Sequence, residues 1–255
     1  MVALHPPQVA VLAGAALAAG AVNAVAGGGS LVSFPALLAV GYPAIDANVT
    51  NTVALCPGYF GGTLGYRREL SGQRARVRAL GATSVVGALL GAFLLVISSP
   101  ELFKLIVPFL IFLACGLLAV QPWLARLVQG RGRPRRAEHR PVALYGVQFL
   151  AAVYGAYFGA GVGIMMLAIL GIFLSDSLQR LNALKGLLSL VINVVAAAYF
   201  ALFAHVAWLA AALMAPAALL GGQVGVLLAR RLDDRVLRVL VIAFGVAVGV
   251  RLLVS

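Results

Sequence analysis

The stretch Gly20–Thr52, GAVNAVAGGGSLVSFPALLAVGYPAIDANVTNT, places three consecutive glycines and a run of small polar side chains inside an apolar sequence. Glycine costs a helix interior about 1 kcal/mol relative to alanine, so Gly27–Gly29 predicts one helix ending near Ala26 and another beginning near Ser30. Such a break leaves backbone polar groups that protein, water or a ligand must satisfy. The N-terminus of the second helix offers N–H donors and a positive dipole end to an anion.

The same pattern recurs 134 positions further along the chain, where Gly161, Val162 and Gly163 take the places of the three glycines. The pairs that this single gapless offset also aligns are Asn48 with Asn182, Asn51 with Lys185, Gly87 with Gly221, Gly91 with Gly225, and the turn 101–104 with the turn 235–238. We therefore predict an internal duplication, with a first transmembrane repeat at 5–124, a basic linker at 125–140 and a second transmembrane repeat at 141–255.

The composition places the chain among membrane proteins. Hydrophobic residues make up 63% of the sequence, charged residues make up 10%, and the mean hydropathy is +1.05. These values lie far outside the range of soluble globular domains. We therefore expect a multi-pass protein in contact with a lipid bilayer.

The positive charges predict how the chain crosses the membrane. Most of the 19 lysines and arginines fall in three clusters between apolar segments, at 67–78, 126–140 and 230–238. Such clusters are typical of cytoplasmic loops and explain the net charge of +12 without nucleic-acid binding. The offset aligns the first cluster with the neutral stretch 204–208, and the neutral turn 98–101 with part of the third cluster. We therefore predict inverted repeats, with both termini outside and the 126–140 linker cytoplasmic.

Each repeat contains five apolar segments. A full span needs about 20 residues, so the segments after the two breaks are short, and Pro35 and Pro43 fit a partial helix in the first repeat. The predicted fold class is an all-α polytopic membrane protein with two inverted-topology repeats and short or broken helices after the breaks. The expected segments are 8–26, 30–41, 47–66, 77–97, 102–124, 141–159, 163–175, 181–203, 209–229 and 236–254.

Lys185 lies inside the apolar segment LNALKGLLSLVINVV (181–195), where a charged side chain is expensive. Three interpretations are open. The lysine contacts an anionic substrate near both breaks, opposite the polar residues that follow the first short segment. Alternatively, it extends to the cytoplasmic interface, because its segment begins near Arg180. The third interpretation is an ion pair with Asp176.

Four small polar residues, Asn48, Thr50, Asn51 and Thr52, follow the first short segment. Helical spacing lets Asn48, Asn51 and Thr52 share one face. Their side chains could donate hydrogen bonds to an oxyanion, or they could cap and join helices, and the sequence favours neither role.

Other polar and small residues have mainly structural interpretations. His205, beside Trp208, is expected in a solvated outer loop, with a proton relay as the alternative, and Asp46 is expected to be a loop or capping residue. Asp233 and Asp234 are expected to balance surface charge. The amides expected mainly to join helices are Asn23, Asn182 and Asn193. The glycine pairs expected to permit close helix contact are Gly58 with Gly62, Gly61 with Gly65, Gly87 with Gly91, and Gly221 with Gly225.

Signals for catalysis are absent from the sequence. It has no HExxH, CxxC or GxSxG motif, no Walker lysine, and no inward pair of carboxylates for acid–base work. We therefore expect no enzyme activity, no bound metal and no cofactor. Cys56 and Cys115 both lie in apolar segments, so a disulfide framework is not expected.

Several stretches resemble the sulfite exporter TauE/SafE family of membrane permeases. In the first half the resemblance rests on GGGSLVSFPALLAVGYPAIDANVTNTVAL (27–55). In the second half it rests on GAGVGIMMLAIL (159–170), LNALKGLLSLVIN (181–193), AHVAW (204–208) and GGQVGVLLARRL (221–232). The second half departs from the pattern, since Ala160 and Val162 separate its glycines and no proline follows. Membership would imply a bacterial inner-membrane protein that moves small anions, with sulfite or organosulfonates as the type substrates.

These observations predict a transporter that works by alternating access around a midplane site between the inverted halves. Membrane potential or a substrate gradient is expected to drive it, because the interior lacks a titratable carboxylate. An anion channel and a non-transporting scaffold are the alternatives, and a homo-oligomer is compatible with either. The predicted substrate-binding residues are Gly27, Gly28, Gly29, Ser30, Asn48, Asn51, Thr52, Gly161, Gly163, Ile164, Asn182 and Lys185, with backbone N–H groups at Ser30 and Ile164 facing the anion.

Overall fold

The computed structural model of the chain describes residues 4–25, 28–65, 68–130, 141–228 and 234–254. These residues form ten helices, and none of them lies in a strand. In chain order the helices are α1 (Pro6–Val25), α2 (Ser30–Val40), α3 (Ala44–Gly65), α4 (Arg74–Ile97), α5 (Pro100–Gly130), α6 (Pro141–Tyr157), α7 (Val162–Phe173), α8 (Leu178–Phe203), α9 (Trp208–Leu228) and α10 (Asp234–Val254).

Each predicted apolar segment corresponds to one helix, and the all-helical fold class is confirmed. Apart from the end of α5, the helix ends lie within about three residues of the predicted ones. Helix α3 begins at Ala44, directly after Pro43. Helix α5 continues to Gly130, into the region predicted as linker, because residues 125–129 contain no glycine or proline that would end it. The remaining linker residues, 131–140, lie outside the described part of the chain.

The helices have the lengths and composition of a membrane protein. Among the described residues, the stretches long and apolar enough to cross a bilayer are Pro6–Asn23, Arg74–Ile97, Pro100–Leu124 and Leu178–Phe203. The short helices α2 and α7 are the ones that follow the two breaks. Large apolar side chains such as Phe93 and Phe109 are exposed on the outside of the bundle, where lipid would cover them.

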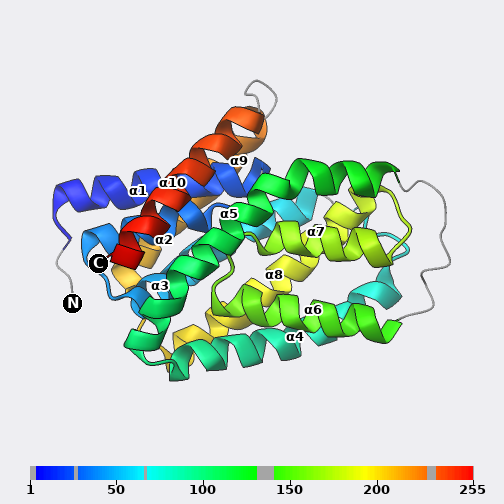
Figure 1. The fold of residues 1–255 in the computed structure, drawn as a ribbon, viewed down its shortest axis with the longest axis horizontal. Helices are drawn as coiled ribbons and strands as arrows, with labels where there is room; N and C mark the ends of the chain where they lie inside the picture. The colour runs from blue at the N-terminus through cyan, green and yellow to red at the C-terminus, as the bar shows by residue number, and fades with distance from the viewer. Residues whose placement is uncertain (1–3, 26–27, 66–67, 131–140, 229–233, 255) are drawn as a thin grey trace.

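The helices of the two halves pack in matched pairs. Helix α1 packs on α9 and α6 packs on α4, which are equivalent contacts under the offset, and so are α3 with α9 and α8 with α4. Helix α3 also packs on its own counterpart α8, and α5 on α10. The start of α1 and the end of α10 lie toward one end of the bundle, and the end of α5 and the start of α6 lie toward the other (Figure 1). A two-fold relation would produce these contacts, while the opposite orientation of the halves across a membrane stays a prediction.

Glycines permit the closest of these helix contacts. A Cβ atom on Gly91 of α4 would overlap the backbone of Val153 on α6, and one on Gly221 of α9 would overlap the backbone of Leu17 on α1. The predicted role in close packing is therefore confirmed at these two positions. At Gly58 it is wrong, because a Cβ there would meet nothing within 4 Å.

Two glycines of α4 offer a direct test of this packing. We expect Gly91→Ala to destabilise the protein by about 1–3 kcal/mol, because the added methyl group must displace the backbone of α6. Gly81→Ala is the matched control, since a Cβ at Gly81 meets nothing within 4 Å and alanine favours the helix by about 1 kcal/mol. Thermal unfolding in detergent measures both effects, and equal midpoints for the two variants would contradict the contact.

Candidate functional site

The first break joins α1 to α2. Gly29 is the residue before α2, and its N–H donates a 2.8 Å hydrogen bond to Oδ1 of Asn23 on α1. A Cβ atom on Gly29 would overlap the carbonyl oxygen of Ala19 and lie 2.8 Å from Cγ of Asn23. Glycine is therefore required here by the close approach of α1, since the backbone φ of −58° is one that any residue adopts. Gly27 lies outside the described residues.

The second break joins α6 to α7. Gly159 and Gly161 have φ values of +80° and +74°, so these positions need glycine for their left-handed backbone. The hydroxyl of Tyr154 donates a 2.6 Å hydrogen bond to the carbonyl oxygen of Ala160 and so satisfies a backbone group of the break. The N–H of Ile164 donates to the carbonyl oxygen of Gly161 at 3.0 Å, so the prediction that this N–H faces an anion is wrong in this structure.

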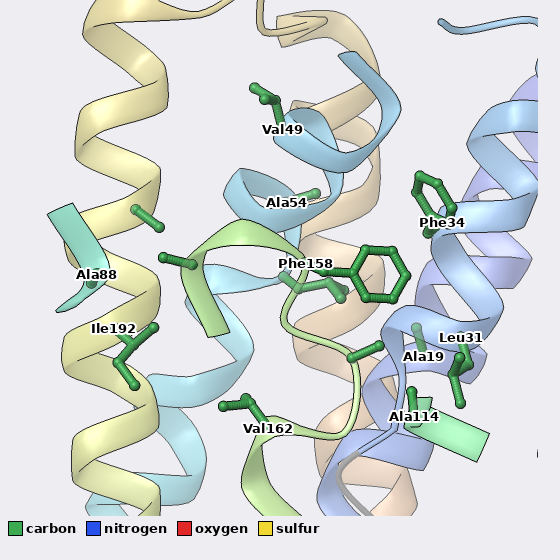
Figure 2. Close-up of a cluster of buried hydrophobic side chains, with 14 of the residues drawn as sticks. Ala19, Leu31, Phe34, Val49, Ala54, Ala88, Ala114, Phe158, Val162 and Ile192 are labelled. Atoms are coloured by element: carbon green, nitrogen blue, oxygen red, sulfur yellow. The ribbon is translucent and has the colours of Figure 1, made fainter. Parts of the chain in front are cut away.

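The second break packs against the short helix of the first half. Phe158 in this break packs edge-on against Phe34 of α2, with ring centroids 5.6 Å apart and ring planes at 84°. Figure 2 shows Phe158 pointing out of the loop between α6 and α7 toward the part of the core that contains Phe34, Leu31 and Ala19. Residues of both breaks are therefore buried in one continuous core rather than in surface loops.

A group of neutral polar side chains surrounds the first break. Ser33 on α2 donates a 2.6 Å hydrogen bond to Oδ1 of Asn51 on α3. Asn51 is only 1% exposed, and none of the described residues accepts a hydrogen bond from its amide nitrogen. The hydroxyl of Tyr59, two turns further along α3, interacts with the amides of Asn23 and Asn193. We call Asn23, Gly29, Ser33, Asn51 and Tyr59 the neutral group.

Sequence reasoning missed Ser33 and Tyr59. Tyr59 lies eight residues after Asn51, so helical periodicity puts both on the same face of α3 and could have identified it. Ser33 lies one turn after Gly29 and accordingly faces the same region. Asn23, which was expected mainly to join helices, does so by accepting the Gly29 N–H.

The other polar residues near the start of α3 form hydrogen bonds with backbone groups. Nδ2 of Asn48 donates to the carbonyl oxygen of Tyr157 at 2.8 Å and thus joins α3 to α6. The hydroxyl of Thr52 donates to the carbonyl oxygen of Asn48 within α3, and that of Thr50 accepts the N–H of Ala207. The helix-joining interpretation therefore describes Asn48 and Thr50, whereas Thr52 bonds within its own helix. Oδ1 of Asn48 is buried and has no hydrogen-bond partner among the described residues.

Lys185 lies on α8 beside the second break. Its Nζ donates a 3.1 Å hydrogen bond to Oδ1 of Asn182, and its Cδ lies 3.8 Å from where a Cβ on Gly163 would be. The predicted alternative of an ion pair with Asp176 is wrong, because Asp176 pairs with Arg76 at 2.7 Å and with Arg180 at 2.9 Å. We call Lys185, Asn182 and Gly163 the cationic group.

The neutral and cationic groups are separate. Thr50, next to Asn51, contacts Ala207 just beyond the C-terminal end of α8, whereas Gly186, next to Lys185, faces Thr63 near the C-terminal end of α3. Helices α3 and α8 are therefore antiparallel, with Asn51 and Lys185 toward opposite ends of the pair. The expectation that Lys185 lies opposite Asn48, Asn51 and Thr52 in one shell is wrong in this structure.

Each end of the α3–α8 pair is tied to the other half of the chain. At one end Nδ1 of His205 lies 3.0 Å from Oδ2 of Asp46. At the other, Arg180 donates to the carbonyl oxygen of Ser71 at 3.1 Å and, together with Arg76, binds Asp176. Partial burial opposes ionisation of Asp176, but hydrogen bonds from Arg180, the Ser177 N–H and Arg76 outweigh it and hold the pKa of this carboxyl below its ordinary value of 3.8.

The sequence that builds these helices and breaks matches a protein-family model. The family profile described as sulfite exporter TauE/SafE matches residues 12–252. The chain belongs to this family. The resemblance noted in the sequence is thereby confirmed, and this TauE/SafE protein is a multi-pass membrane protein of a transporter family.

Curated relatives agree with this assignment. A chain from Sinorhizobium sp. named probable membrane transporter protein ORF9 is 28% identical over 94% of this chain and 90% of its own length. Probable membrane transporter protein YfcA of Escherichia coli K12 is 25% identical over 98% and 91%. A probable membrane transporter protein of Haemophilus influenzae is 27% identical over 80% and 78%. No solved structure matches the chain.

The chemistry available at the two groups of this TauE/SafE protein is that of hydrogen-bond donors and one ammonium. Within the described ranges, no three His, Cys, Asp or Glu side chains lie together as metal ligands would. An ammonium and an amide nitrogen are donors that suit an oxyanion.

The first break can be tested with two adjacent glycines. We expect Gly29→Ala to lower the thermal midpoint, with a loss of about 1–3 kcal/mol, because its methyl group must push α1 away and break the bond to Asn23. Gly28→Ala is the matched control, because a Cβ there makes only ordinary contacts with Leu118, at 3.5 Å or more. Two equally stable variants would show that the close approach of α1 is not what requires glycine.

The ion pairs of Asp176 predict a pH dependence of stability. Since the folded pKa is below the ordinary value, the stabilisation is present above pH 3.8 and is lost as the pH falls through the folded pKa. Asp176→Asn should therefore cost about 1–3 kcal/mol at neutral pH and almost nothing below the folded pKa. Thermal midpoints of both proteins across this range check the trend, and Glu101→Gln, at an exposed carboxyl on α5, is the control. A difference that stays constant down to low pH would contradict it.

Proposed function

We propose that this TauE/SafE protein transports a small anion, sulfite or an organosulfonate, by alternating access between its two halves. The observation that supports this function best is Lys185, an ammonium within a membrane-spanning helix, beside a backbone break, with no carboxylate among the described residues within 4 Å. The family description names sulfite export, and the relatives are named as transporters.

Lys185 lies inside α8 and not in its first turn. It stands seven residues after Leu178, the first residue of α8, which is roughly 10 Å along the helix at about 1.5 Å per residue. Its one hydrogen-bond partner among the described residues, Asn182, is neutral and leaves two ammonium protons for another acceptor. A charge held this way in an apolar helix marks a substrate or ion pathway more often than a structural contact.

In this proposal the neutral group is a second binding position for the anion. The amide nitrogen of Asn51 has no acceptor among the described residues, and it lies toward the opposite end of the α3–α8 pair from Lys185. We place one anion contact at Lys185 and Asn182, and a weaker one at Asn51 and Ser33. An anion would pass between these two contacts when the halves move, and the weaker contact would favour its release.

The ties at the two ends of the α3–α8 pair suit alternating access. The contact of His205 with Asp46 joins the halves at one end, and the contacts of Asp176 and Arg180 join them at the other. In our proposal each tie opens while the other holds. Charged groups of the break-lining helices are confined to these ends apart from Lys185, so potential or an anion gradient would drive the flux more than protons.

Counterflow in proteoliposomes tests this function. We expect saturable uptake of labelled sulfite or methanesulfonate that unlabelled anion on the other side accelerates. Lys185→Gln should lower the uptake at least about tenfold, equivalent to 1.4 kcal/mol, because the anion loses its only cationic contact. Lys104→Gln, at an exposed lysine near the start of α5, is the control and should transport normally.

The outcomes separate the candidate functions. Flux that neither saturates nor responds to unlabelled anion on the other side would indicate that the protein is a channel and not a transporter. No flux of any small anion, from protein shown to be folded, would overturn the proposal.

A further inference from the structure

We infer that the cationic group selects singly charged anions, so that the transported forms are hydrogensulfite or a sulfonate and not doubly charged sulfite or sulfate. This inference rests on the proposed function and specifies the charge of its substrate. It follows from the charges of the helices that form the two breaks and the α3–α8 pair.

These helices contain few charged residues. Helices α1, α2, α6 and α7 contain no Asp, Glu, Lys or Arg, and α3 and α8 contain only Asp46, Arg180 and Lys185. Asp46 lies in the first turn of α3 and contacts His205, and Arg180 lies in the first turn of α8 and binds Asp176. Lys185 is therefore the one charge of these helices that no opposite charge neutralises among the described residues.

The described contacts of Lys185 and of Arg76 bring no second cation to the cationic group. Arg76, at the start of α4, is committed to Asp176 at 2.7 Å. The residues that surround Lys185 more closely, Asn182, Gly163 and Thr63 beside Gly186, are neutral. Within these described contacts, an anion bound at the cationic group would thus meet one full positive charge and neutral hydrogen-bond donors.

Charge balance then decides between the two ionic forms. The Coulomb attraction to one ammonium doubles when the charge of the anion doubles, but the free energy of removing the anion from water rises with the square of its charge. A monoanion leaves a neutral pair in the apolar interior, whereas a dianion leaves an uncompensated negative charge. Neutral amide donors such as those of Asn182 and Asn51 bind oxygens of either form and do not reverse this balance.

Methanesulfonate and sulfate are suitable probes, because both present sulfonyl oxygens and they differ by one unit of charge. Inhibition of labelled methanesulfonate counterflow by each unlabelled anion is measured in proteoliposomes at constant ionic strength and neutral pH. We expect methanesulfonate to compete at least about tenfold more strongly than sulfate, which corresponds to 1.4 kcal/mol.

Two variants connect the selectivity to Lys185. Lys185→Arg keeps the charge and should keep the preference for the monoanion. Asn182→Lys adds a second cation one turn away and should narrow the preference by raising competition by sulfate. Lys104→Gln is the matched control and should leave the selectivity unchanged.

The results distinguish this inference from the function on which it rests. Equal competition by sulfate and methanesulfonate in a protein that transports both would overturn the charge selectivity and leave anion transport intact. If Asn182→Lys leaves the preference for methanesulfonate over sulfate unaltered, the cationic group is not the origin of that preference. If no anion is transported, the proposed function itself fails.

Discussion

Lipid offers no hydrogen-bond partner to backbone N–H and carbonyl groups, and this constraint governs the two breaks. Each break is stabilised by one side chain of the helix before it. Asn23 accepts the N–H of Gly29 in the first, and Tyr154 donates to the carbonyl oxygen of Ala160 in the second. These two hydrogen bonds let irregular backbone persist in the buried core, where residues from both halves meet.

Much of this fold follows from local features of the sequence. The ten segments are set by apolar runs of defined length, and the breaks are set by glycines, so both could be predicted from the chain alone. The proximity of Lys185 to the second break was also predictable, because α7 and α8 are joined by a short connection and must lie side by side. Helix ends were less certain, as the continuation of α5 to Gly130 shows.

The separation of Asn51 from Lys185 was not predictable, for a geometrical reason. An offset between repeats aligns Asn51 with Lys185, but it does not say where a symmetry axis crosses the helices. In the structure the equivalent residues that interact are Tyr59 and Asn193, each two turns further along its helix. Helices α3 and α8 run antiparallel. Two equivalent residues that both precede the crossing point in the sequence, one on each helix, therefore lie on opposite sides of it. Asn51 and Lys185 thus lie toward opposite ends of the pair.

The contact between Tyr59 and Asn193 also bears on how such a protein could arise. A dimer of two identical short chains would set the same side chain against itself at this crossing, with two phenols or two amides facing each other. It would likewise carry either two lysines or none at the positions of Asn51 and Lys185. Joining the halves in one polypeptide would remove that restriction and would permit a charge such as that of Lys185, unpaired among the described residues, in one half alone.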